Sequence, residues 1–289
     1  MILVVVGPTG VGKTKMSVEL AKRYNAEIIN ADSMQFYKGL DIGTAKVTED
    51  EKEGIKHHLF DICDVTDMYT VYDYQKDGRK LIEELEKQNK NIVIVGGTGL
   101  YIKALLYDYK FKQEEELDDY NDLTNEEIYE KIKKYTNDFD VHINNRKRLI
   151  RLLNKYEQDL IEDKNGNKKL YDFKMIGLTT DRETLYKKID DRVDKMVENG
   201  LIEEAKSFYD KKIYSKALET GIGYKELYKA FDNEITLDEA IDLIKKNSRH
   251  YAKRQYTFFK NQFKDITWYQ TNYDDFNKTV EEVINSIKV

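Results

Sequence analysis

An eight-residue glycine-rich stretch near the N-terminus carries the clearest chemistry in this chain. It reads Gly7-Pro8-Thr9-Gly10-Val11-Gly12-Lys13-Thr14 and matches the phosphate-binding loop G-x-x-x-x-G-K-[ST]. In such a P-loop, backbone N–H groups and the N-terminus of the following helix surround an anion. Lys13 adds a charge for the terminal phosphates, and the Thr14 hydroxyl can ligate Mg²⁺. The stretch predicts a bound oligophosphate, but not whether a phosphate is transferred.

Two more polar positions follow apolar runs that predict strands. Asp32 follows the run 27–30 and could hold a metal in the second shell, act as a general base, or cap a following helix. Thr98 lies in a glycine-rich turn after the run 91–95, where it could orient a ligand or cap a helix. Nucleotide-hydrolysing P-loop proteins normally carry an acid after a second apolar strand. Here that strand ends in two glycines, which argues against phosphoryl transfer.

The elements that must position these residues alternate between strands and helices. Apolar runs at 2–6, 27–30, 91–95 and 173–178 predict strands, with helices between and after them. The prediction is an α/β fold, a P-loop NTPase-like parallel sheet flanked by helices. The three polar strand ends should meet around one pocket. We expect a P-loop core over 1–109, a smaller helical insertion domain over 110–140, and over 141–289 the rest of the core with helices that bind nucleic acid.

Composition narrows the class of protein. The chain has 289 residues, a net charge of -6, one cysteine and four histidines, which predicts a cytosolic protein without disulfides or a zinc site. No apolar run is long enough to span a membrane. We also expect the protein to be a monomer. Despite 54 acidic residues, the segments 142–155 and 245–264 are basic and contain no acid. Two such runs favour a polyanionic partner over an ordinary solvated face.

Taken together, these motifs resemble the tRNA dimethylallyltransferases, also called tRNA isopentenyltransferases, of the bacterial type. The resemblance covers almost the whole chain. Besides the P-loop it rests on Asn30–Lys46, His57–Asp61, Val95–Tyr101, Gly221–Glu226 and Tyr251–Gln255. The zinc finger at the C-terminus of eukaryotic members is absent from this sequence.

The resemblance implies transfer of the five-carbon group of dimethylallyl diphosphate to the exocyclic amine (N6) of the adenosine 3′ of the anticodon in tRNA. Asp32 would be the general base, because an adenine amine is a poor nucleophile until its proton is removed. Thr98 would orient the amine. Lys13, the loop N–H groups and Mg²⁺ on Thr14 would stabilise the departing diphosphate.

The tRNA anticodon stem-loop is the partner that the resemblance implies. The flipped adenosine would contact the segment after the second strand, and two basic segments would hold the tRNA. The implied tRNA contacts are Asp32, Ser33, Met34, Gln35, Thr98, Lys147, Arg148, Leu149, Ile150, Arg151, Arg249, Lys253 and Arg254. The chain departs from many relatives at Thr220, where they carry Gln or Arg. If an Arg at this position binds diphosphate in relatives, Lys225 or Arg254 would take over that role in this chain.

Three other functions stay open on these residues. An isopentenyltransferase acting on free adenine nucleotides would keep the P-loop and Asp32 but need no basic surface. A P-loop kinase of a small metabolite would turn over ATP, which the missing acid after the strand 91–95 disfavours. A tRNA-binding protein without catalysis would have no use for Asp32, Thr98 and Lys13.

Overall fold

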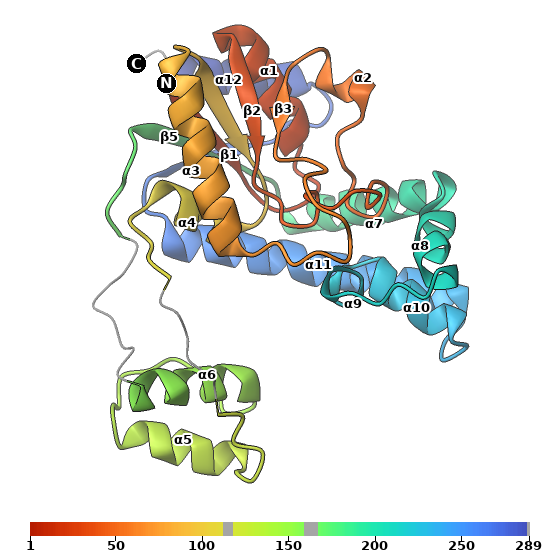
Figure 1. The fold of residues 1–289 in the computed structure, drawn as a ribbon. Coiled ribbons are helices and arrows are strands. Elements are labelled where there is room, and N and C mark those ends of the chain that lie inside the picture. The colour runs from red at the N-terminus through yellow and green to blue at the C-terminus, as the bar shows by residue number, and fades with distance from the viewer. Residues whose placement is uncertain (112–117, 159–166, 288–289) are drawn as a thin grey trace. The chain divides into compact units, whose positions relative to one another are not determined.

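The computed structural model describes residues 1–111, 118–158 and 167–287, which fall into two compact units. The first unit comprises Met1–Tyr107 and Lys169–Val289, and the second comprises Asp108–Lys168. Within the described ranges the first unit holds a parallel sheet of order β3-β2-β4-β1-β5-β6 (Figure 1). The strands are β1 (Ile2–Val6), β2 (Ala26–Asn30), β3 (His57–His58), β4 (Asn91–Val95), β5 (Phe173–Thr179) and β6 (Ile266–Gln270). The predicted fold class, a parallel sheet flanked by helices, is confirmed.

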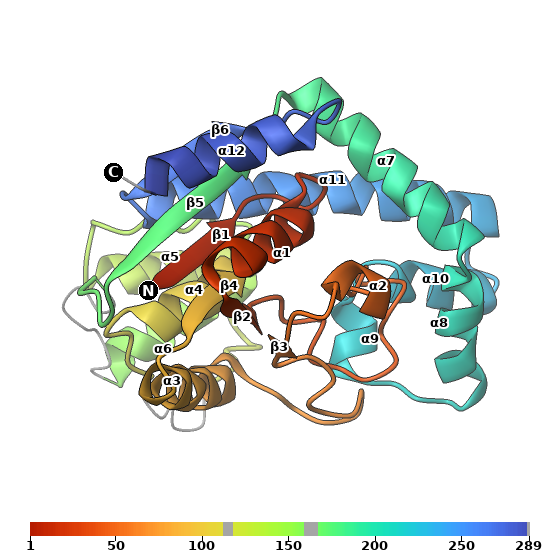
Figure 2. The same cartoon turned by 90° about the horizontal axis from the view of Figure 1, so that it is seen from above.

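The central strand β1 explains the two layers of helices. All of its side chains are buried, as expected of a parallel strand covered on both faces. Leu3 and Val5 pack in one core with α1 (Lys13–Tyr24) and α12 (Phe276–Ile287). The alternate side chains of β1 pack in the other core with α3 (Val71–Lys87) and α4 (Gly99–Leu106). Figure 2 shows α1 and α12 on the opposite side of the sheet from α3 and α4.

The remaining helices of the first unit include a cluster with its own core. They are α2 (Glu49–Lys52), α7 (Arg182–Glu198), α8 (Leu201–Asp210), α9 (Lys216–Thr220), α10 (Tyr224–Phe231) and α11 (Leu237–Gln262). Leu201, Leu218 and Leu227 are fully buried in this core. No helix within the described ranges is long and apolar enough to cross a membrane.

The second unit is a small helical body. Helices α5 (Asn125–Lys133) and α6 (Arg146–Glu157) pack on one another around Ile128, Ile132 and Leu153. Its bounds differ from the predicted insertion domain 110–140, because the basic helix α6 packs against α5 and belongs to the same unit. The sequence alone did not reveal this pairing.

Candidate active site

The carboxyl ends of β1, β2 and β4 meet around one cavity, as predicted. The cavity has a volume of about 690 Å³. Its wall includes Gly10, Gly12, Lys13 and Thr14 of the P-loop, Asp32, Ser33, Met34 and Gln35 after β2, Gly96 after β4, and the residues Thr220 to Lys225 between α9 and α10. The cavity therefore joins the phosphate loop to the predicted base.

The P-loop has the backbone that an anion site requires. Gly10 and Gly12 have φ values of 89° and 88°, which only glycine adopts without strain. A Cβ on Gly7 would lie 2.4 Å from the carbonyl oxygen of Leu178, so the loop also passes close to β5. Gly12 precedes α1 and has no side chain to cap it. The first N–H groups of α1 thus remain available to a bound anion.

Lys13 lies inside the loop. Its Nζ donates to the carbonyl oxygen of Pro8 at 2.8 Å. Burial lowers the pKa of Lys13 to about 8; the charge of Asp32 opposes this shift and that of Arg192 adds to it. A bound diphosphate would reverse the shift, because an anion favours the protonated amine.

Asp32 is held at the end of β2 by its neighbours. Its backbone N–H donates to Asn30 Oδ1 at 2.9 Å, and its Oδ1 accepts from the N–H of Met34 at 3.2 Å. No helix follows Asp32 directly, so a helix cap does not account for this carboxylate. Burial raises the pKa of Asp32, while Lys13, the Met34 N–H and Arg192 oppose the rise. Carboxylates with a shifted pKa beside cations are typical of functional sites, and the general-base role of Asp32 remains a prediction.

Thr98 lies in the turn after β4 and contacts Ser33, the residue that follows Asp32. Its Oγ1 accepts from the N–H of Ser33 at 3.2 Å, and it does not cap α4 with its side chain. The turn needs its glycines: a Cβ on Gly97 would lie 2.1 Å from Nε2 of the buried Gln255. Gln255 in turn accepts from the N–H of Thr9 at 2.8 Å. One buried amide thus ties the P-loop to the turn that carries Thr98.

Sequence reasoning missed Arg192, which reaches the cavity from α7. Its guanidinium donates to Thr9 Oγ1 at 2.8 Å and lies 3.5 Å from the carbonyl oxygen of Thr44. Burial lowers its pKa, and the charge of Asp32 opposes that shift. The overlooked signal was helical spacing. Arg192 follows the buried Ile189 by three residues, so a cation lies on the apolar face of an amphipathic helix.

The predicted tRNA contacts fall into different surroundings. Arg254 lines the cavity, whereas Arg249 pairs with Asp190 at 2.5 Å. Lys253, Lys147 and Arg148 are exposed on their helices. Leu149 requires a correction: its side chain is fully buried in the core of the second unit, so it cannot face a nucleic acid. The roles of the exposed residues remain predictions.

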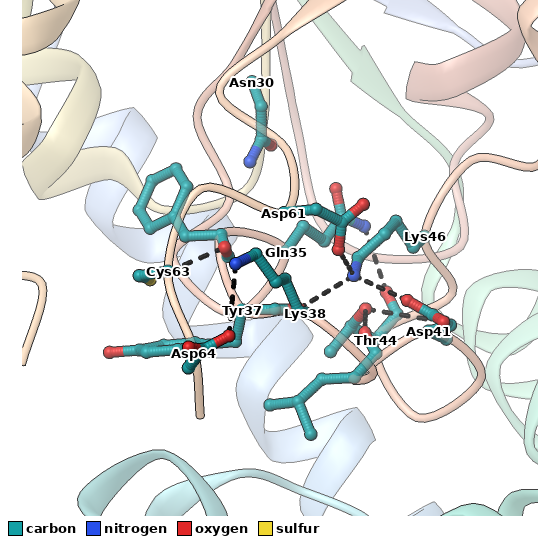
Figure 3. A network of polar contacts seen from close by, with 12 residues as sticks. Asn30, Gln35, Tyr37, Lys38, Asp41, Thr44, Lys46, Asp61, Cys63 and Asp64 are labelled. Carbon is teal, nitrogen blue, oxygen red and sulfur yellow. Dashed lines mark hydrogen bonds and ion pairs between the residues drawn. The ribbon is translucent and has the colours of Figure 1, made fainter. Parts of the chain in front are cut away.

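A lysine anchors the loop that borders the cavity (Figure 3). The side chain of Lys46 is 7% exposed, and its Nζ donates to Tyr37 O at 2.8 Å, Asp41 Oδ1 at 2.6 Å and Asp61 Oδ1 at 2.5 Å. Nearby, Gln35 Nε2 donates to the carbonyl oxygen of Thr44 at 3.1 Å. The bond to Thr44 fixes the orientation of the Gln35 amide at the cavity wall.

Replacing Lys46 by methionine is expected to lower the free energy of unfolding by about 1–2 kcal/mol. The lost ammonium leaves a backbone carbonyl and two carboxylates without their shared donor, although both carboxylates are roughly half exposed and water offsets part of the cost. Urea denaturation measures the change. Lys38→Met is the matched control, since the ion pair of Lys38 with Asp64 is exposed on both sides. Equal effects of the two substitutions would contradict the anchoring role.

The fold and the cavity together define an α/β P-loop protein with a carboxylate facing its phosphate site. The model of the IPP transferase family matches residues 35–262. A tRNA dimethylallyltransferase of Anoxybacillus flavithermus is 44% identical, covering 99% of this chain and 96% of its own length. One from Bacillus subtilis is also 44% identical, covering 93% of this chain and 90% of its own.

Solved structures agree with the sequence relatives. The tRNA isopentenylpyrophosphate transferase of Bacillus halodurans superimposes with a TM-score of 0.79 at 41% identity, covering 99% of this chain and 95% of its own. A eukaryotic dimethylallyltransferase, described as acting on tRNA, gives a TM-score of 0.82 at 28% identity over 99% of this chain and 78% of its own. The chain belongs to the IPP transferase family.

Proposed function

We propose that this enzyme transfers the dimethylallyl group of dimethylallyl diphosphate to N6 of the adenosine 3′ of the anticodon in tRNA, and releases diphosphate. The observation that carries the proposal is the shared cavity of the P-loop and Asp32. A phosphate loop facing a general base suits a reaction in which carbon moves and diphosphate departs. The family relatives named for this activity support the assignment.

In the proposed reaction, N6 attacks the allylic carbon while the bond from that carbon to the diphosphate oxygen breaks. Asp32 accepts the N6 proton. Thr98 orients the amine through its hydroxyl, which is held against Ser33. The diphosphate gains negative charge as it leaves. Lys13, Arg192 and the N–H groups at the start of α1 stabilise that charge.

Mg²⁺ is the cofactor that these residues suit. The Thr14 side chain is exposed at the cavity wall, next to the uncapped N-terminus of α1, and its hydroxyl would hold this small hard cation. When bound, Mg²⁺ supplies positive charge to the leaving diphosphate.

The pH dependence of kcat/KM for the donor should be bell-shaped. The rate rises with pH as Asp32 loses its proton, at a pH above the usual carboxyl range because burial raises its pKa. It falls as free Lys13 loses its proton, since the pKa of Lys13 is lowered to about 8. Lys13→Arg should remove the alkaline limb, because a guanidinium keeps its proton there. An unchanged alkaline limb in Lys13→Arg would assign that titration to another group.

One assay separates this function from the alternatives. The protein is incubated with labelled dimethylallyl diphosphate, Mg²⁺ and either unmodified tRNA or AMP, alongside an ATP-turnover control. Label on tRNA, lost on addition of EDTA, supports the proposal. Label on AMP supports an enzyme for free nucleotides, and ATP turnover without prenyl transfer supports a kinase. Binding of tRNA without any turnover would leave only a tRNA-binding role.

We also propose a monomer, as expected from the sequence. Sedimentation velocity at assay concentrations should give a species of about 34.2 kDa. A dimer that dissociates with loss of activity would contradict this.

A further inference from the structure

The segment that follows the edge strand β6 packs against the P-loop. Thr271 Oγ1 donates to the carbonyl oxygen of Val11 at 3.0 Å, and Tyr273 Oη donates to that of Gly10 at 3.0 Å. The ring of Phe276 faces Gly12 so closely that a Cβ there would lie 2.6 Å away. Thr271–Phe276, here called the buttress, is more than 250 positions from the loop it touches.

The two hydroxyls act on peptide units whose orientation matters for anion binding. In a trans peptide the C=O and the N–H point in opposite directions, and the described chain has no cis peptide bonds. A bond that fixes the Gly10 carbonyl therefore also fixes the Val11 N–H, which points the opposite way. The bond to the Val11 carbonyl does the same for the N–H of Gly12. The orientation of each of these N–H groups is thereby fixed before a ligand arrives.

The buttress is itself well fixed. The N–H of Thr271 donates to the carbonyl oxygen of Thr179 at 2.8 Å, which extends the pairing of β5 and β6. The Asn272 side chain accepts from the N–H groups of Asp274 and Asp275 at 3.1 and 3.0 Å. Burial raises the pKa of Tyr273 to about 12, so its hydroxyl keeps the proton that it donates.

We propose that Thr271 and Tyr273 are positioning residues that preorganise the P-loop for the diphosphate of the prenyl donor. A loop with glycines in the left-handed region loses much backbone freedom when an anion orders it. Contacts that hold the loop beforehand remove part of that cost and strengthen binding. The donor diphosphate is taken from the function proposed above, and the buttress adds residues that never touch it.

The test compares Thr271→Val and Tyr273→Phe with the wild type. Each should weaken binding of inorganic diphosphate with Mg²⁺, measured by calorimetry, by roughly 3- to 10-fold, the size of one lost hydrogen bond. KM for dimethylallyl diphosphate should rise by a similar factor, while KM for tRNA stays constant. Thr271→Ser should retain wild-type binding, because it keeps the hydroxyl.

Tyr269→Phe is the matched control. It removes a hydroxyl on β6 that bonds to Ser286 of α12, close to the buttress but not on the P-loop. Wild-type diphosphate affinity in Tyr269→Phe, with weakened affinity in Tyr273→Phe at comparable thermal stability, supports the proposal. Unchanged affinity in both buttress variants, or equal loss in the control, overturns it.

Failure of the proposed function gives a different result. A wild-type protein that binds diphosphate but prenylates no tRNA would refute the transfer reaction, while the calorimetric comparison would still decide the role of the buttress. A wild-type protein that binds no diphosphate would overturn the buttress proposal.

Discussion

Replacing Asp32 by asparagine is expected to lower kcat for prenyl transfer by about 10³-fold. The amide keeps the shape of the side chain and can still accept from the N–H of Met34, but it cannot take a proton from N6. The loss should appear in single-turnover experiments with labelled donor and saturating tRNA, where binding does not limit the rate.

The same substitution, Asp32→Asn, should affect binding of the prenyl donor differently from kcat. The negative charge of Asp32 acts on Lys13 and Arg192, the two cations assigned to the diphosphate. Removing that charge leaves both cations free to attract the anion, so diphosphate affinity should hold or increase. Affinity for tRNA should also be retained. Asp64→Asn, an exposed carboxylate in a neighbouring loop, serves as the control and should keep wild-type kcat. If Asp32→Asn kept most of its kcat, another group would have to remove the proton.

The sequence predicted the site best where chemistry is local. The P-loop, Asp32 and Thr98 each follow a short apolar strand. Because β1, β2 and β4 are parallel neighbours, their carboxyl ends lie at the same edge of the sheet. The alternation of apolar runs with helical patterns was equally visible. These features depend on residues within a few positions of one another.

Contacts between distant segments could not be predicted in this way. Arg192 meets Thr9 across 183 positions, and Thr271 meets Val11 across 260. Nothing near either residue in the sequence points to its partner. The short edge strands β3 and β6 were also missed, because β3 has only two residues and the side chains of β6 are mostly partly exposed or exposed.

Leu149 shows a different kind of error. It was assigned to tRNA because it lies within a segment that resembles a tRNA-contacting one, although its own spacing indicates the core. Leu149 and Leu153 are four residues apart on α6, and both are fully buried. A family segment transferred as a block carries core residues along with surface ones, and helical periodicity separates the two.

Arg192→Leu is expected to lower kcat/KM for dimethylallyl diphosphate by about 10²-fold, with KM for tRNA little changed. A partly buried guanidinium at the P-loop interacts more strongly with diphosphate charge than an exposed one, because less water screens it. Thr220, which also lines the cavity, contributes no charge, and its hydroxyl donates to Lys216 O at 2.6 Å. This chain should therefore depend heavily on Arg192.

A pH profile distinguishes this electrostatic role from a structural one. The charge of Arg192 lowers the pKa of Asp32, so Arg192→Leu should raise that pKa and move the acidic limb of the profile to higher pH. Added guanidinium should restore part of the rate to Arg192→Ala. Arg182→Leu, an exposed arginine at the start of the same helix, should change neither the rate nor the profile. If Arg192→Leu kept the wild-type kcat/KM, the diphosphate contact would have to be assigned to Lys225 or Arg254, which also line the cavity.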